Sequence, residues 1–299
     1  MLKSFRHLFA YFLAFSLLKF GFVSRARKRI LKEGLILSIF FHDPPRTLFV
    51  ACIKWLKRKG FHFISIKELR QYALGEISLP EGAVLLSIDD GWKGNLENVV
   101  DVVNDLQIPI ALFVSTEPVE HGGGYWWSYV SKAKKLGISH WAVEALKKQH
   151  NDYRVKMLSA IRSSIFLERE AITKDELISI ASSKYITIGS HTVTHPILPT
   201  CTDGAAEFEI FESKKKLEQW LSREVYSFSY PNGDYSQREI DLIKKAEFQI
   251  AFTGSPGYLT KDGLCDMYEV PRFEIFESAS FLENICRMTG VWFMNKRLK

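Results

Sequence analysis

Short runs of almost uninterrupted apolar residues alternate with amphipathic segments along most of the chain. Such runs are typical of strands buried on both faces of a sheet, and the segments between them repeat their apolar positions at helical spacing. The alternation predicts an α/β protein with a parallel sheet or barrel, whose ligand chemistry lies at the carboxyl ends of the strands. The predicted strands fall within residues 35–42, 61–66, 83–91, 108–115, 185–190, 225–233, 248–254 and 268–275.

The alternation is interrupted between residues 121 and 183. A run of glycines, the aromatic stretch YWWSY, and Lys-rich and Glu-rich helical segments follow one another there without a clear apolar strand. We therefore predict a helical insertion at about 121–183, inside one domain that spans 35–299.

The first 34 residues differ from the rest in hydropathy. Residues 8–23 form an apolar run that is interrupted by Lys19 and followed at once by the basic block SRARKR. As a helix this run reaches about 24 Å, which is short of a membrane span. We predict a monotopic membrane-associating helix within 1–34, embedded in one leaflet, with the domain on the cytoplasmic side. The alternative is a helix buried against the domain.

The positive charge of the chain is concentrated at the same end. Residues 1–34 hold eight basic side chains and one acidic one, whereas the other 265 residues hold 32 basic and 33 acidic ones. The body of the protein is therefore almost neutral. This distribution argues against a nucleic-acid partner, which would need a basic face on the fold.

Two motifs at predicted strand ends carry candidate metal chemistry. In SIDDG, Asp89 and Asp90 end a buried strand, and in GSHTVTHP, His191 and His195 follow another one at a spacing of four. Two imidazoles and one carboxylate make a catalytic metal site with an open position, and the second carboxylate remains free to act as a base. Alone, the first motif is equally an Asp-Gly turn, and the second a capped helix start with a core histidine.

A third motif, SYPNG at 229–233, also follows a predicted strand. Its Pro and Gly favour a tight loop that can direct the backbone N–H of Asn232 at a developing oxyanion. An ordinary β-turn explains the same residues.

Taken in this order, SIDDG, SHTVTHP and YPNG resemble the polysaccharide deacetylase family (NodB-homology domain, carbohydrate esterase family four). The resemblance covers about residues 35–280 outside the insertion and implies a distorted (β/α)7 barrel. It implies hydrolysis of N-acetyl groups on a hexosamine with a divalent metal, zinc being the expected ion. It further implies Asp89 as general base, Asp90, His191 and His195 as metal ligands, and the Asn232 N–H as an oxyanion donor.

Two residues depart from the family pattern. The arginine of its third motif is Ser229 here, so we expect Arg272, in VPR near the last strand, to orient Asp89; the alternative is a structural or surface arginine. The family's C-terminal histidine is missing, because no histidine follows His195. His42, in FFHDP at the end of the first strand, resembles the acid histidine of permuted members, and its alternative is a structural histidine.

The predicted function is removal of N-acetyl groups from a glycan that the basic, apolar N-terminus places near a membrane, for example a lipid-linked saccharide. An Fe(II) oxygenase shares the arrangement of two histidines and one carboxylate. A non-catalytic glycan-binding protein on the same fold is the other alternative, suggested by the altered third motif.

Overall fold

The apolar runs form the strands of a single parallel sheet. The computed structural model describes residues 2–294, and each strand in it lies within one of the predicted runs. Neighbouring strands follow the order β7-β6-β5-β4-β3-β1-β8, and β2 pairs with β3 outside this path. The strands are β1 (Leu37–Phe41), β2 (His62–Ile64), β3 (Ala83–Ile88), β4 (Ile110–Val114), β5 (Ile186–Ser190), β6 (Ser227–Ser229), β7 (Ile250–Phe252) and β8 (Phe273–Glu274).

The sheet curls until its two ends meet. Phe252 of β7 forms a parallel bridge with Val270, which lies three residues before β8. The backbone N–H of Thr253 also donates to the Val270 carbonyl at 2.9 Å. This contact joins the ends of the seven-strand path, so the predicted distorted (β/α)7 barrel is confirmed.

Both faces of β1, β3, β4, β6 and β7 are buried, which explains why these runs are almost continuously apolar. On β3, Val84, Leu86 and Ile88 belong to the core beneath the outer helices, whereas Leu85 packs with Phe113 inside the barrel. The helices that cover the barrel are α3 (Arg46–Arg58), α4 (Ile66–Ala73), the π-helical turn η1 (Leu96–Val100) with α5 (Asp101–Leu106), α10 (Lys174–Ala181), α11 (Asp203–Leu221), α12 (Gln237–Lys245) and α13 (Phe281–Met288).

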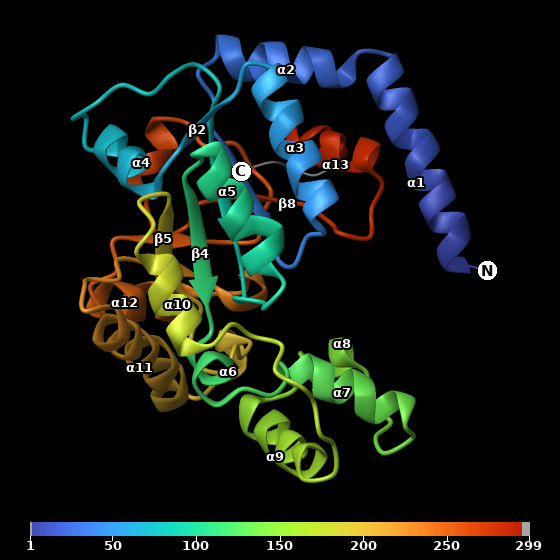
Figure 1. Cartoon of the computed structure of the whole chain (residues 1–299), viewed down its shortest axis with the longest axis vertical. Coiled ribbons are helices and arrows are strands. Elements are labelled where there is room, and N and C mark those ends of the chain that lie inside the picture. Colours follow the sequence, from blue (N-terminus) through green and yellow to red (C-terminus); the bar gives the residue numbers. More distant parts are fainter. Residues whose placement is uncertain (1, 295–299) are drawn as a thin grey trace.

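The chain between β4 and β5 is helical and lies near the carboxyl end of β4 (Figure 1). Part of it has a small core of its own, formed by Trp126, Leu146, Leu158 and neighbouring apolar residues. α10, at the end of this segment, instead contributes Leu177 to the main core. The helices before α10 are α6 (Thr116–His121), α7 (Trp126–Lys135), α8 (Val143–Leu146) and α9 (Asn151–Arg162).

Two helices precede the barrel, α1 (Leu2–Lys19) and α2 (Phe22–Lys32), and α1 packs on α13. Within residues 2–294, no single helix has the length and hydropathy to cross a membrane. α1 and α2 meet those criteria only as a pair, bent by 60°. The remaining short turns are the 3-10 helices η2 (Leu198–Thr200), η3 (Pro231–Gly233), η4 (Asp262–Cys265) and η5 (Val291–Phe293).

Candidate metal centre and active site

All seven residues singled out from the sequence line one cavity of about 540 Å³. Six of them follow the carboxyl ends of β1, β3, β5 and β6, which parallel strands deliver to the same edge of the barrel, and Arg272 directly precedes β8. Trp127 of α7, Glu144 of α8 and Lys147, which directly follows α8, also line the cavity. The seven are His42, Asp89, Asp90, His191, His195, Asn232 and Arg272.

A sharp turn after β3 presents the two adjacent carboxylates. Asp90 and Gly91 both adopt positive φ, 76° and 86°. A Cβ on residue 91 would lie 2.7 Å from Val114 Cγ1, so the turn needs glycine for both conformation and space. The turn therefore lets the carboxylates of Asp89 and Asp90 lie side by side, although the two residues are consecutive at the end of the strand.

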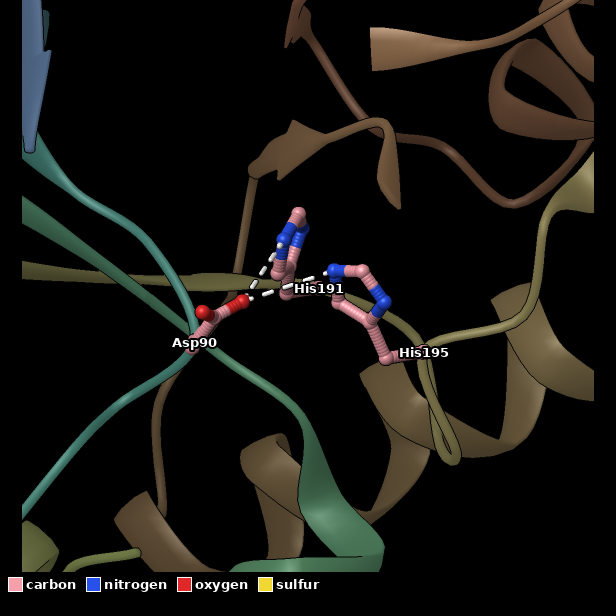
Figure 2. A group of neighbouring side chains, drawn as sticks. All are labelled: Asp90, His191 and His195. Carbon is pink, nitrogen blue, oxygen red and sulfur yellow. Dashed lines mark ion pairs between the residues drawn. The ribbon is translucent and has the colours of Figure 1, made fainter. Parts of the chain in front are cut away.

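Asp90, His191 and His195 converge on one point (Figure 2). The Nε2 atoms of His191 and His195 lie 3.5 and 3.4 Å from Asp90 Oδ1, and the three candidate ligand atoms are within 4.8 Å of one another. All three residues are buried. One carboxylate and two imidazoles in this arrangement can hold a metal ion and leave coordination positions open.

Neighbouring groups orient these atoms for a cation. Trp92 Nε1 donates to Asp90 Oδ2 at 2.8 Å, which leaves Oδ1 free, and Asp90 Oδ1 has no hydrogen-bond partner among the described residues. His191 Nδ1 lies 2.7 Å from the Ser229 carbonyl, so Nδ1 carries the proton and Nε2 offers its lone pair. An unpaired buried carboxylate oxygen facing two imidazole nitrogens fits a divalent metal ion.

The protonation states also suit a metal. Burial alone would raise the pKa of Asp90, but the surrounding imidazoles of His191, His195 and His42 lower it, so the carboxyl is ionised. Burial, reinforced by His191, lowers the pKa of His195 to about 3, so this imidazole is neutral at physiological pH. A carboxylate and a neutral imidazole are the forms that bind metals.

A buried glutamate holds the loop that carries both histidines. Glu209 of α11 accepts from the backbone N–H groups of Val193 and Thr194, both at 2.8 Å, and from Thr194 Oγ1 at 2.6 Å. His195 itself adopts a positive φ of 56°, and Trp126 Nε1 donates to its carbonyl at 2.9 Å. The motif therefore forms a braced loop, and its two imidazoles meet through the loop geometry.

Asp89 is held by Arg272 through two parallel hydrogen bonds of 2.8 Å. Arg272 is 1% exposed, its guanidinium lies over the Phe40 ring, and Ser229 Oγ links the two groups, 3.1 Å from Asp89 Oδ2 and 2.8 Å from Arg272 Nη2. Burial would raise the pKa of Asp89, but the Arg272 charge outweighs it and lowers the pKa. Asp89 is therefore an ionised, oriented carboxylate beside the metal ligands.

His42 lies at the end of β1 and is surrounded by carboxylates. Its Nδ1 is 3.9 Å from Glu274 Oε1, and its backbone N–H donates to Glu277 Oε1 at 3.0 Å. Burial would lower the pKa of His42, but Asp90, Asp89, Glu274 and Glu277 together raise it. The imidazole therefore keeps its proton to a higher pH than an ordinary histidine does.

Asn232 lies in a tight turn whose shape depends on glycine. Asn232 and Gly233 have φ of 58° and 76°, and a Cβ on residue 233 would lie 2.5 Å from the backbone nitrogen of Gly254. Lys147 Nζ, from the residue that follows α8, donates to Asn232 Oδ1 at 2.8 Å. The segment between β4 and β5 thus contacts the third motif across the cavity.

Several residues that shape this site were not predicted from the sequence. Trp92 directly follows SIDDG, and Glu274 lies two residues beyond Arg272 on the same face of a strand, so both had a signal in spacing. Lys147 and the linking role of Ser229 had none, because each depends on a contact between distant segments.

These features define a class of protein: an α/β barrel with a buried site of one carboxylate and two imidazoles. The family model for polysaccharide deacetylase matches residues 76–251, more than half of the chain. The chain therefore belongs to the polysaccharide deacetylase family.

Individual relatives are distant. YxkH of Bacillus subtilis (strain 168), named as a polysaccharide deacetylase, is 21% identical over 231 residues, which make up 77% of this chain and 65% of YxkH. The deacetylase PplD from Streptococcus pyogenes, solved with acetate, shares 14% identity and a TM-score of 0.61 over 85% of this chain and 98% of its own. The BpsB deacetylase domain from Bordetella bronchiseptica shares 13% identity and a TM-score of 0.63, over 81% and 96%. At these identities the structures support the fold.

The indole of Trp92 provides the first test of the metal centre. We expect Trp92→Phe to weaken metal binding about 10- to 100-fold, because the hydrogen bond that orients Asp90 is lost. The measurement is competition with a chromophoric chelator. Trp127→Phe is the matched control, since Trp127 packs its ring against His195 within the same cavity. Equal losses of metal affinity in both variants would show that metal binding depends on the bulk of the indole ring and not on this hydrogen bond.

Proposed function

We propose that the protein is a metal-dependent hydrolase that removes N-acetyl groups from hexosamine residues of a glycan, with zinc as the metal. The observation that carries this proposal is the buried Asp90, His191 and His195 cluster beside the Arg272-held carboxylate of Asp89. His42 lines the same cavity. Family membership supports the reaction class.

Asp90, His191 and His195 would hold the metal through Oδ1 and the two Nε2 atoms. Such an ion, when bound, lowers the pKa of its water and polarises a carbonyl. Asp89, ionised by its pair with Arg272, accepts the proton of the attacking water. The backbone N–H of Asn232 is the chain's own donor to the oxyanion that develops on the acetyl group.

His42 completes the reaction by giving its proton to the departing amine nitrogen. An acid in this role has to be protonated at the working pH, and the carboxylates around His42 favour that form. The products are acetate and a free amine on the sugar. After one reaction Asp89 has gained a proton and His42 has lost one. Proton exchange with water returns both residues to their starting protonation states.

Glu274 provides a test of this assignment through pH. We expect Glu274→Gln to lower the pKa of His42, since a negative charge 3.9 Å from Nδ1 is removed. The alkaline limb of kcat/KM then moves to lower pH, because the acid loses its proton earlier. Glu144→Gln, at the mouth of the same cavity, is the control and leaves the limb in place. An unchanged limb in Glu274→Gln would assign the acid to another group.

The substrate proposal extends to a glycan near a membrane, such as a lipid-linked saccharide. It is supported by the apolar and basic composition of residues 1–34. The test compares free N-acetylhexosamine oligosaccharides with lipid-linked ones, and measures acetate and new amine together before and after chelation of the metal. Equimolar acetate and amine, with or without dioxygen, support the hydrolase. Release that needs dioxygen, or binding without release from any substrate, would contradict it.

A further inference from the structure

One side of helix α1 packs on the molecule, and its other sides expose apolar side chains. Ala14 is fully buried, and its carbonyl lies 3.9 Å from Cys286 Sγ of α13. Figure 1 shows α1 at the outside of the molecule, beyond α13. Seven large apolar residues of α1 and the turn after it are 41–70% exposed, and we call them the α1 apolar surface: Leu8, Phe9, Tyr11, Phe12, Leu13, Phe15 and Phe20.

A surface of this kind is unusual in water. Soluble monomers rarely expose large contiguous apolar patches, and a helix that is apolar on all sides is either buried in protein or placed in lipid. Phe9 and Phe20 are 70% and 67% exposed, so the protein leaves these two side chains largely uncovered. The contact with α13 fixes the position of the helix and leaves its outer sides available to a partner.

Charge at the edges of this surface identifies the partner. The twelve residues between Arg6 and Lys19 contain no Asp, Glu, Lys or Arg, and no acidic residue precedes Glu33. α2 continues with exposed cations, among them Arg25, Lys28 and Lys32. Apolar side chains bordered by cations complement an anionic phospholipid surface.

The dimensions favour a helix lying in one leaflet over a span. A charge-free run of twelve residues extends about 18 Å along a helix, well short of a hydrocarbon core. α2 cannot add the missing length, because Val23 and Ile30 are buried in the protein and Arg27 Nε donates to the Lys59 carbonyl at 2.6 Å. α2 therefore belongs to the body of the protein, and α1 alone is free to enter lipid.

A cavity of about 390 Å³ lies beside α2, and its lining likewise combines apolar and cationic side chains. Phe22, Ala26 and Val291 supply apolar lining, and Arg25 and Arg29 line it as well. Cations next to apolar side chains suit the phosphate end of a phospholipid, where head group and acyl chains join.

We propose that the α1 apolar surface inserts into one leaflet of an anionic phospholipid bilayer, with the cations of α2 on the head groups. The partner is the bilayer itself, so the proposal is independent of the reaction and of the metal. Insertion of α1 attaches the barrel to the membrane surface through α13, the helix on which α1 packs.

Vesicle sedimentation with the full chain tests this. We expect the wild type to bind phosphatidylcholine vesicles that contain one quarter phosphatidylglycerol. Phe9→Glu with Phe12→Glu is expected to lower the partition coefficient at least about tenfold, because two apolar contacts are replaced by anions. Phe166→Glu with Phe208→Glu is the matched control: these phenylalanines are 80% and 56% exposed, lie outside α1, and leave binding unchanged.

A second pair of substitutions tests the charge. We expect Lys28→Gln with Lys32→Gln to weaken binding to the anionic vesicles by about fivefold per charge, and to leave binding to pure phosphatidylcholine unchanged.

Three results would overturn the proposal: absence of wild-type binding to the anionic vesicles, equal losses in the control pair, or a stable dimer in solution that the Phe9 and Phe12 substitutions dissociate. The last would assign the α1 apolar surface to a second copy of the chain.

Discussion

Replacing Asp89 by asparagine is expected to lower kcat for acetate release about 10²- to 10⁴-fold, the range of a general base. The amide keeps the size of the side chain and can still accept from Arg272 through one oxygen, but it cannot take a proton from water. Metal binding should be almost unchanged, because Asp90 Oδ1 and the two imidazoles form the ligand set.

The measurement is kcat and KM on one N-acetylated oligosaccharide, together with bound metal per chain. Asp105→Asn, an exposed change of the same chemistry, is the control. If Asp89→Asn kept more than a tenth of the wild-type kcat while binding metal normally, the base would lie elsewhere.

Replacing Arg272 by methionine is expected to lower the free energy of unfolding by about 3–5 kcal/mol, the usual effect of removing one partner of a buried ion pair. Arg272 is 1% exposed and Asp89 3%, so the carboxylate would remain buried without its two hydrogen bonds. Activity should fall as well, because the pKa of Asp89 rises when burial is no longer opposed by Arg272.

The stability loss in Arg272→Met is expected to depend on pH. In the wild type the pKa of Asp89 is lowered, so the ion pair stabilises the fold above the unfolded pKa of about 3.9 and this stabilisation is lost in acid. In Arg272→Met the buried carboxyl resists ionisation, so the deficit is largest at neutral pH and shrinks towards pH 4. Urea unfolding of the variant and the wild type, at neutral pH and at pH 4, measures this deficit in the free energy of unfolding. A double variant with Asp89→Asn should recover part of the loss, and no recovery would mean that Arg272 stabilises the barrel interior independently of Asp89.

The fold was largely predictable because its strands are buried on both faces. Residues such as Val84 and Leu85 point into different cores, so the run is apolar apart from the buried Ser87 and does not alternate as a half-exposed strand would. The bridge between Phe252 and Val270 was not predictable, because closure of the barrel depends on twist and register across the whole sheet.

The parts of the site that could be predicted are the residues that lie in short sequence motifs. The rule that strand ends share an edge brought Asp90, His191 and His195 together, and the choice of Asp90 over Asp89 as a ligand rested on the resemblance to the deacetylase family. The brace of Glu209 on the histidine loop lies in α11 with no mark in composition, and Lys147 reaches Asn232 only because α8 lies beside the cavity. Such contacts join segments whose relative position no local pattern encodes.

Of the N-terminal alternatives, a helix in lipid or a helix on the domain, the structure shows contact of one side of α1 with the domain, and insertion of its exposed sides into lipid stays a proposal. Ala14 is buried against the protein, whereas Phe9 and Phe12 are exposed. The sequence could not separate these sides, because nearly every position in the run is apolar. The cytoplasmic location of the domain stays a prediction.

The central claim is that one divalent ion, held by Asp90, His191 and His195, supports hydrolysis of an N-acetyl group. The most direct measurement titrates Zn²⁺ into chelator-treated protein and records bound metal and acetate release from an N-acetylhexosamine oligosaccharide in the same samples. We expect activity to rise in proportion to bound metal and to saturate at one ion per chain, with neither effect in His191→Ala. Acetate release by the metal-free protein, or full loading with no release from free or lipid-linked substrate, would contradict the claim.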